Sequence, residues 1–275
     1  TVLPAALISF MVTWVRIATP VAQKIFITGA SSGIGAALAQ HYAGRGATLG
    51  LAARRAAQLQ TLADSLATEV CIYALDVSDT AALSSAAQDF IARHGVPDIV
   101  IANAGISAGT RSEQAEDIAV LVKIMQTNVI GLAATLQPFV AAMRARGSGI
   151  LVGIASVAGF RGLAGAGAYC ASKSAAITWL ESLRLELHGS GVDVVTICPG
   201  FVATPLTAGN RNRMPFLLGA PAAARRIALA IEARKPLAII PWQMRMVFLF
   251  LRRMPNWLYD RLFARAPRKP RNSST

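Results

Sequence analysis

The chain has 275 residues, of which 54% are hydrophobic and only 15% are charged. This composition excludes a disordered or low-complexity protein and suffices for one large domain with a buried core. The 27 basic and 14 acidic residues give a net charge of +13, which is compatible with nucleic acid, an anionic membrane or an acidic partner. Three cysteines without CxxC spacing predict neither disulfides nor a zinc site and favour a reducing compartment.

The first 23 residues form an apolar segment whose role the sequence leaves open. Residues 1–15 are too few for a membrane span, which needs about 20 apolar residues. They also lack the basic region and the cleavage site of a secretory signal. Met11 is a candidate start, in which case residues 1–10 would not be native.

From Lys24 the chain alternates short apolar runs with helical stretches. We expect strands at 24–28, 47–53, 70–75, 98–103, 149–155, 192–198 and 237–240, and helices at 34–44, 56–67, 113–146 and 168–188. Strands that alternate with helices of about 10–15 residues indicate a parallel sheet with helices on both faces. The sequence therefore predicts one α/β domain over residues 24–241, a Rossmann-type doubly wound parallel sheet, followed by a helical extension at 242–275.

A glycine-rich loop joins the first strand to the first helix. Its sequence, TGASSGIG at 28–35, carries Gly29, Gly33 and Gly35. Glycines allow a tight turn and a close approach of the backbone to a pyrophosphate, which the N–H groups and the positive end of the helix then bind. A glycine cluster in this position also occurs as a plain tight turn, so the loop alone leaves both interpretations open.

Arg54 and Arg55 end the second strand, where an NAD-binding protein carries an acid. No carboxylate lies between Gly46 and Asp64. The ribose 2′-OH of NAD is bound by a carboxylate, whereas a 2′-phosphate is bound by guanidinium groups. The arginine pair therefore predicts NADP(H), and the alternative is two solvated arginines at the start of a helix.

Tyr169 and Lys173 are four residues apart in a predicted helix, which puts them on one face with Cβ atoms about 5–6 Å apart. A free tyrosine has a pKa of about 10. An adjacent ammonium and an oxidised nicotinamide ring both favour the phenolate, so we expect the pKa of Tyr169 to fall toward the neutral range. Ser156 ends the fifth strand, where its hydroxyl can donate to a substrate oxygen. A Tyr–Lys pair alone is also a common surface pair on helices.

Together these motifs resemble those of the short-chain dehydrogenase/reductase family. The resemblance rests on TGASSGIG, Asp76-Val77, NAG at 103–105, Asn128, Ser156, YCASK at 169–173 and PGFVAT at 199–204, and it extends over about residues 24–240. It implies hydride transfer between a nicotinamide and a carbonyl or an alcohol. It also implies a catalytic tetrad of Asn128, Ser156, Tyr169 and Lys173.

In this tetrad the resemblance gives each side chain a role. Tyr169 would donate the proton during reduction, and Ser156 would hold the carbonyl. Lys173 would lower the pKa of Tyr169 and bind the nicotinamide ribose, while Asn128 would support a water that links Lys173 to solvent. Cys170, inside the tyrosine motif, is expected only to pack.

The same resemblance implies the cofactor site. The predicted cofactor-binding residues are Gly29, Ser31, Ser32, Gly33, Ile34, Gly35, Arg54, Arg55, Asp76, Val77, Asn103, Ala104, Gly105, Tyr169, Lys173, Pro199, Gly200, Val202 and Thr204. Asp76 and Val77 would contact adenine, and the loop from Pro199 to Thr204 would meet the nicotinamide. Asp79 could instead be an ordinary helix N-cap. No metal site is expected.

Two apolar segments lie outside these motifs. Residues 205–221 occupy the place where this family has a substrate lid. Their apolar side chains Met214, Phe216, Leu217 and Leu218 could cover an apolar substrate or pack in the core. In the extension 242–275, Trp, Phe and Leu lie between arginines, which is typical of an interfacial helix and equally of helices packed on the domain or on a second subunit.

The excess positive charge lies in this part of the chain. There are 13 basic and 12 acidic residues up to Thr204, but 14 basic and 2 acidic residues from Pro205 onward. No nucleic-acid-binding motif accompanies the charge. An anionic membrane surface or an acidic carrier protein is therefore the expected partner, and nucleic acid is not.

From these observations we expect an NADP(H)-dependent carbonyl reductase or alcohol dehydrogenase that acts on an apolar or lipid-like substrate. It would be cytoplasmic, either free or peripherally bound to a membrane, and it would form a homo-oligomer, a dimer or a tetramer. A 3-oxoacyl-carrier-protein reductase shares all the motifs and is the main alternative. An alternative of another class is a noncatalytic NADP-binding membrane or regulatory module, which the intact Tyr169 and Lys173 disfavour.

Overall fold

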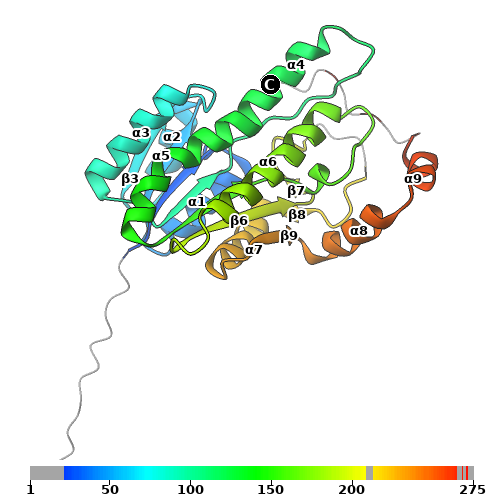
Figure 1. The fold of residues 1–275 in the computed structure, drawn as a ribbon. Helices are drawn as coiled ribbons and strands as arrows, with labels where there is room; N and C mark the ends of the chain where they lie inside the picture. The colour runs from blue at the N-terminus through cyan, green and yellow to red at the C-terminus, as the bar shows by residue number, and fades with distance from the viewer. Residues whose placement is uncertain (1–21, 209–212, 265–267, 269–270, 272–275) are drawn as a thin grey trace, which may run out of the picture.

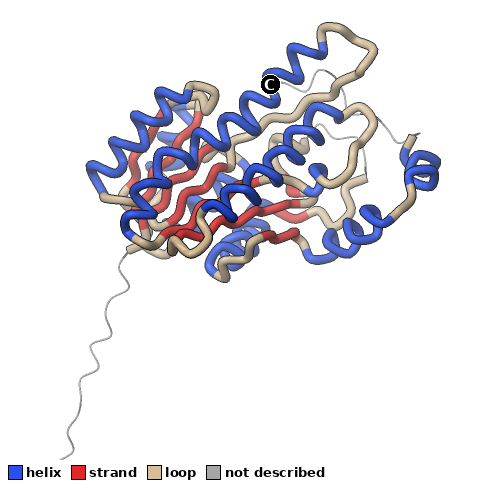
Figure 2. Tube along the Cα trace, viewed as in Figure 1, coloured by secondary structure: helices blue, strands red, loops and turns tan. Residues whose placement is uncertain are grey.

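A seven-stranded parallel sheet forms the centre of the computed structural model, which describes residues 22–208, 213–264, 268 and 271. The strand order is β3-β2-β1-β4-β5-β6-β9 (Figures 1 and 2). The strands are β1 (Lys24–Thr28), β2 (Thr48–Ala53), β3 (Val70–Ala74), β4 (Ile99–Ala102), β5 (Gly149–Ile154), β6 (Val192–Pro199) and β9 (Leu237–Ile240), with a separate short pair, β7 (Val202–Ala203) and β8 (Leu218–Gly219). The predicted Rossmann-type sheet is confirmed. Residues 1–21, most of the apolar N-terminal segment, lie outside the described residues.

Helices cover both faces of this sheet. On one face lie α1 (Gly33–Ala43), α2 (Ala56–Asp64) and α7 (Ala220–Glu232), and on the other α3 (Thr80–His94), α5 (Gly131–Arg146) and α6 (Gly167–Glu186). Successive side chains of a strand point to opposite faces, so Ile25 and Ile27 of β1 pack with the first group and Phe26 with the second. Because both faces are covered, the strands are apolar at successive positions.

Two of these helices, α3 and α7, were not predicted. The side chain of Asp79 caps α3 by accepting a hydrogen bond from the N–H of Ala82 at 2.9 Å. The N-cap interpretation of Asp79 is therefore correct. The buried residues of both helices recur at helical spacing, for example Leu83, Ala87 and Phe90 in α3, so the sequence does carry a periodic signal for them.

The helical region predicted near 113–146 is divided into three parts. These are α4 (Asp117–Met125), a π-helical turn η1 (Gln126–Ile130) and α5. Asp117–Arg146 is also the one described stretch that is long and apolar enough to cross a membrane. Its α5 part packs against α3 and β4, as a core helix of the domain does.

Two further helices follow β9 and pack beside the loop that leaves β5. They are α8 (Trp242–Arg253) and α9 (Asn256–Phe263), at the lower right of Figure 1. The rings of Phe248 and Phe160 have centroids 3.8 Å apart. The hydroxyl of Tyr259 donates to the carbonyl of Gly162 at 2.8 Å, and the guanidinium of Arg161 lies 4.0 Å from the centre of the Tyr259 ring. The predicted helical extension thus packs on its own domain.

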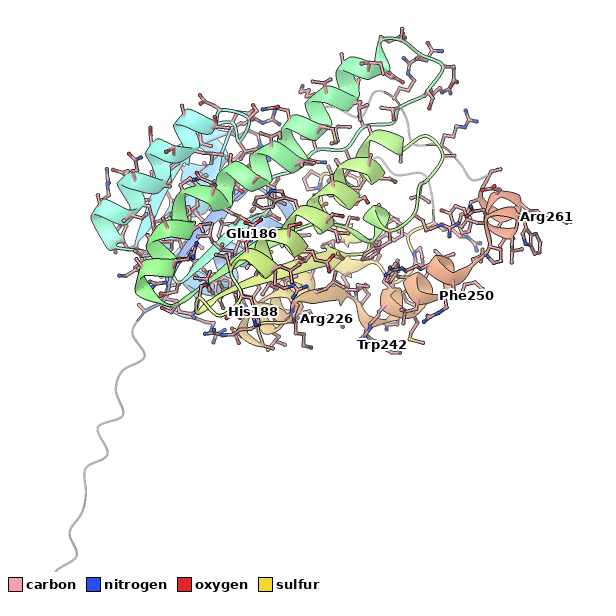
Figure 3. All side chains as sticks on the ribbon, in the orientation of Figure 1. Glu186, His188, Arg226, Trp242, Phe250 and Arg261 are labelled. Carbon is pink, nitrogen blue, oxygen red and sulfur yellow. The ribbon has the colours of Figure 1, made fainter. Side chains whose placement is uncertain are left out.

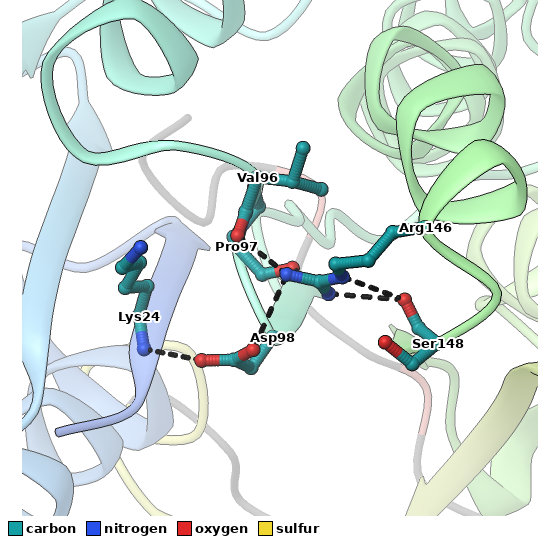
Figure 4. Close-up of polar contacts among 6 residues, drawn as sticks. All are labelled: Lys24, Val96, Pro97, Asp98, Arg146 and Ser148. Atoms are coloured by element: carbon teal, nitrogen blue, oxygen red, sulfur yellow. Dashed lines mark hydrogen bonds and ion pairs between the residues drawn. The ribbon is translucent and has the colours of Figure 1, made fainter. Parts of the chain in front are cut away.

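At the opposite end of the sheet, Arg146 joins the end of α5 to the starts of β1 and β4 (Figure 4). Its guanidinium donates to the carbonyls of Val96 and Pro97, each at 2.7 Å, and lies 3.3 Å from the carboxylate of Asp98. Asp98 in turn accepts the backbone N–H of Lys24 at 2.9 Å. One side chain therefore holds three segments in register.

Replacing Arg146 is expected to destabilise the fold. Arg146→Ala removes the side-chain donor of three carbonyls, those of Val96, Pro97 and Ser148, and the ion pair of Asp98, so the free energy of unfolding should fall by about 2–3 kcal/mol. Urea denaturation measures this change. Arg184→Ala is the matched control because Arg184 forms only an exposed pair with Glu181, and its effect should stay below about 0.5 kcal/mol. Equal changes in the free energy of unfolding in the two variants would show that the Arg146 contacts stabilise the fold no more than an exposed ion pair does.

Candidate active site

A cavity of about 540 Å³ opens at the carboxyl edge of the sheet, where the strand order reverses at β1. Ligands of open α/β sheets bind at such switch points. All the predicted site residues except Gly35 and Asn128 line this cavity. A second cavity, of about 660 Å³, lies between α2, β3 and α3 and contains none of them.

The glycine loop fits closely against the end of β4. Gly29 has a φ of +67°, and a Cβ there would lie 2.7 Å from the Cα of Ala104. A Cβ on Gly35 would lie 2.3 Å from the carbonyl oxygen of Gly29. The amide of Asn103 donates to the carbonyls of Thr28 at 3.0 Å and Gly29 at 3.1 Å. Only glycine fits these two positions, and Asn103 holds the loop from behind.

Arg54 and Arg55 reach the cavity from the end of β2. The Nη2 atom of Arg55 donates to the hydroxyls of Ser31 at 3.0 Å and Ser32 at 2.8 Å. Ser32 is the N-cap of α1, and within the described chain its side chain makes no capping bond to that helix. Arg54 lies 3.7 Å from the carboxylate of Asp76. A guanidinium, two hydroxyls and the positive end of a helix thus meet in one place, which is a donor set that fits phosphate groups.

Asp76 and Val77 border the same cavity after β3. Burial acts to raise the pKa of Asp76, but hydrogen bonds from Ser78 and the charge of Arg54 outweigh burial, and the pKa is lowered. Ser78 donates its N–H at 2.9 Å and its hydroxyl at 2.8 Å to Oδ1 of Asp76. The carboxylate is therefore held in one orientation.

Tyr169 and Lys173 share one face of α6, as predicted. The Nζ atom of Lys173 lies 5.9 Å from the centre of the Tyr169 ring and donates to the carbonyl of Ile154 at 2.8 Å. Ser156 caps the short helix η2 (Val157–Gly159), and its hydroxyl accepts the N–H of Ala158 at 3.1 Å. The end of β5 and the first turns of α6 therefore bring serine, tyrosine and lysine to one wall of the cavity.

The structure gives the pKa of Tyr169 for the protein without a nicotinamide, and there the expected fall does not occur. Burial raises the pKa of Tyr169 to about 12, although a hydrogen bond with Ser156 acts in the opposite direction. Burial also lowers the pKa of Lys173 to about 8, so its charge is itself weakly held. Desolvation dominates both groups because α6 packs against η2, η1 and β6. A positive charge brought into the cavity would lower the pKa of Tyr169.

Asn128 lies in η1 and is fully buried. Its Oδ1 atom accepts the N–H of Ile106 at 2.8 Å, and its amide donates to the carbonyl of Ile106 at 2.9 Å and to the hydroxyl of Ser172 at 3.0 Å. A Cβ on Gly105 would lie 3.3 Å from Oδ1 of Asn128 and 3.5 Å from Nζ of Lys173. Asn128 therefore stands next to Lys173 and fixes the loop after β4.

The loop after β6 closes the cavity from the other side. A Cβ on Gly33 would lie 3.1 Å from Cγ2 of Thr204, so this loop touches the glycine loop. The hydroxyl of Thr207 donates to the carbonyl of Val202 at 2.7 Å and accepts the N–H of Thr204 at 3.1 Å. Thr207 thus folds the loop, a role that no sequence motif indicated.

Other parts of the cavity wall were also missed from the sequence. These lining residues are Ala53, Leu75, Ile106, Ser107, Thr127, Ile154 and Ala155. Most directly follow strands or flank recognised motifs, so strand ends were the available signal. Of the predicted lid 205–221, only Pro205, Leu206 and Thr207 line the cavity, and residues 209–212 lie outside the described residues. Cys170 is buried, consistent with packing.

Comparisons with known proteins agree with this geometry. The family model described as short chain dehydrogenase matches residues 23–215. An uncharacterised oxidoreductase of Myxococcus xanthus is 41% identical over 85% of this chain and 93% of its own length. The ketoacyl reductase HetN of a Nostoc species is 33% identical over 72% of this chain and 70% of its own length. The structure of an alcohol dehydrogenase from Thermococcus sibiricus in complex with 5-hydroxy-NADP has a TM-score of 0.72 and 26% identity, covering 80% of this chain and 96% of that one.

The chain therefore belongs to the short-chain dehydrogenase/reductase family. It is an oxidoreductase of that family, whose members act on CH–OH or carbonyl groups of small molecules with a nicotinamide cofactor. The close-fitting glycines and the donors around Ser31 and Ser32 fit such a dinucleotide on the geometry of this chain alone.

Lys173 is expected to make stability depend on pH. Burial lowers its pKa from 10.5 to about 8, so between these values the folded chain has released a proton that the unfolded chain retains. The free energy of unfolding therefore gains a contribution that rises with pH across this window. Urea denaturation of wild type and Lys173→Met at about pH 7.5 and about pH 10 should show their difference moving in favour of wild type by about 2–3 kcal/mol. A difference that does not change with pH would contradict the buried, depressed lysine.

Proposed function

We propose that this protein is an NADP(H)-dependent oxidoreductase that interconverts a carbonyl and an alcohol by hydride transfer, with reduction as the main direction. One observation carries the proposal: Ser156, Tyr169 and Lys173 line the same cavity as the glycine loop and Arg55. When bound, the reduced nicotinamide supplies the hydride. The protein must then supply a proton and a fixed position for the substrate oxygen.

The side chains divide this work. The hydroxyl of Tyr169 donates its proton to the substrate oxygen, and the hydroxyl of Ser156 holds that oxygen by a hydrogen bond. Ser156 already forms a hydrogen bond with Tyr169, so both hydroxyls converge on one point. Lys173, anchored to the carbonyl of Ile154, favours the phenolate that remains. Asn128 holds α6 next to Lys173 through its hydrogen bond to the hydroxyl of Ser172.

The preference for NADP(H) is supported by Arg54 and Arg55. Arg55 already bridges the hydroxyls of the glycine loop, and Arg54 lies beside the ionised Asp76. A 2′-phosphate between the two guanidinium groups would meet charge-assisted hydrogen bonds. A free 2′-OH gains much less from the same groups, since no carboxylate lies between Gly46 and Asp64.

An apolar or lipid-like substrate is supported by the side of the cavity near the loop after β6. Ile106, Val202 and Leu206 line it, and Phe216 and Leu217 of the proposed lid are about half exposed. A 3-oxoacyl thioester on an acidic carrier is the competing substrate within the same chemistry, and a ketoacyl reductase is among the relatives. NADPH oxidation assayed with a panel of ketones, aldehydes and 3-oxoacyl thioesters separates the two.

We also propose that the chain forms a homo-oligomer, as members of this family often do. Ile118 and Val122 of α4 are one helical turn apart and are 63% and 60% exposed. Such a row is apolar enough to be covered by a second copy. The basic extension is proposed to meet an anionic partner.

Tyr169→Phe is expected to bind NADPH normally and to lose turnover. The substitution removes the proton donor and leaves the ring, so kcat should fall by about 10²–10⁴-fold while the fluorescence titration of NADPH stays unchanged. Tyr73→Phe is the matched control, because its hydroxyl binds Asp89 at 2.8 Å outside the cavity. Full turnover in Tyr169→Phe would refute the catalytic assignment, and a noncatalytic NADP-binding module would instead show no turnover in wild type.

Replacing Arg54 and Arg55 together by alanine is expected to separate the two cofactors. The affinity for NADPH should fall by about 10²-fold, since two charge-assisted contacts to the 2′-phosphate are lost, while the affinity for NADH changes little. Fluorescence titration measures both. Arg93→Ala, which breaks only an exposed pair with Asp89, should alter neither. Equal losses for NADPH and NADH would exclude recognition of the 2′-phosphate.

A further inference from the structure

Helix α8 has two apolar rows on opposite sides. Met244 and Phe248 are buried against the domain, with 7% and 9% of their surface exposed. Trp242, Met246 and Phe250 are spaced by four residues, so they form a second row, and they are 68%, 59% and 66% exposed. A helix that only packs on its own domain needs one apolar stripe. The second row therefore requires another explanation.

Helix α9 exposes two further large apolar side chains. Trp257 and Leu262 are 69% and 57% exposed. We call Trp242, Met246, Phe250, Trp257 and Leu262 the outer face. Figure 3 shows Trp242 and Phe250 on α8 and Arg261 on α9 along the outer edge of the molecule. An apolar surface that contains two tryptophans and is bordered by charge is typical of an interaction site.

The charges that border the outer face are almost all positive. Arg245, Arg252, Arg253 and Arg261 are exposed, and Asp260 is the one acidic residue of α8 and α9. None of the ion pairs found among the described residues uses these four arginines. By contrast Arg271, further along the chain, pairs with Glu116 and Asp117 at the start of α4. The four arginines thus remain available to a partner.

We propose that the outer face docks on an anionic lipid surface. Tryptophan, phenylalanine and leucine enter the boundary between headgroups and acyl chains, and arginines beside them pair with anionic headgroups while their aliphatic stems stay apolar. An acidic carrier protein would neutralise the arginines but would leave much of the aromatic row in water. A second copy meeting the same face would bring arginines against arginines. A lipid surface satisfies both the apolar row and the charge.

Docking in this way puts the lipid against helices that contact a loop of the proposed site. Helices α8 and α9 pack on Phe160 and Gly162, in the loop that connects Ser156 to Tyr169. If the proposed reductase activity holds, an apolar substrate dissolved in the lipid is presented next to the catalytic hydroxyls. This consequence rests on the proposed function, whereas the docking itself does not.

Co-sedimentation of the full chain with vesicles tests the docking. The probes are vesicles of phosphatidylcholine and phosphatidylglycerol in equal amounts, and vesicles of phosphatidylcholine alone. The full chain should bind the anionic vesicles at least tenfold more tightly, and added salt should weaken this binding. The double variant Trp242→Ser/Phe250→Ser should bind at least tenfold more weakly than wild type. Leu185→Ser/Leu229→Ser is the matched control, because both leucines are 64% exposed on other helices, and it should bind like wild type.

Each opposite result overturns the proposal. It fails if the full chain stays in the supernatant, if the aromatic variant sediments like wild type, or if that variant only changes the oligomeric state in analytical ultracentrifugation without lipid. Turnover of a water-soluble ketone with NADPH, measured without vesicles, should be the same in wild type and in the aromatic variant. Loss of turnover in all preparations together with intact vesicle binding would refute the proposed reductase and leave the docking in place.

Discussion

The position of β1 determines where every part of the site can lie. It pairs with β2 on one side and with β4 on the other, and the helices that follow β1 and β4 lie on opposite faces of the sheet. The segments that follow β1 and β4 therefore separate at the carboxyl edge of the sheet and leave room between them. Asn103 spans this divergence by bonding to the carbonyls of Thr28 and Gly29. These hydrogen bonds hold the glycine loop against the end of β4.

A second constraint is the desolvation of Lys173 and Tyr169. Lys173 is 4% exposed, and the hydrogen bond found for its Nζ atom among the described residues goes to a backbone carbonyl and not to a carboxylate. Its pKa therefore falls, while that of the neighbouring Tyr169 rises. Both shifts favour the neutral forms of the two side chains. The protonation of Tyr169 and Lys173 therefore responds strongly to any charge that enters the cavity.

The sequence was most informative where chemistry requires one residue type at one place. Gly29 and Gly35 were identifiable because a side chain cannot fit there, and Tyr169 and Lys173 because a helix aligns positions four apart. The missed helices α3 and α7 bury residues at helical spacing, so they too could have been predicted from the sequence pattern. The π-helical turn around Asn128 and the bonds of Thr207 depend on contacts with Ile106, Ser172 and Val202, which no local pattern encodes. The raised pKa of Tyr169 could not be predicted for the same reason, since its cause is burial, which is a property of the assembled fold.

The contact between Phe160 and Phe248 changes how the C-terminal extension is understood. The ring centroids lie 3.8 Å apart, and Phe160 belongs to the loop between Ser156 and Tyr169. The extension thus supports that loop from outside the cavity, whose lining residues all lie between Gly29 and Thr207. A chain shortened after β9 would keep every recognised motif of its family and still lose this support, so sequence motifs alone do not mark all the contacts that position the proposed site.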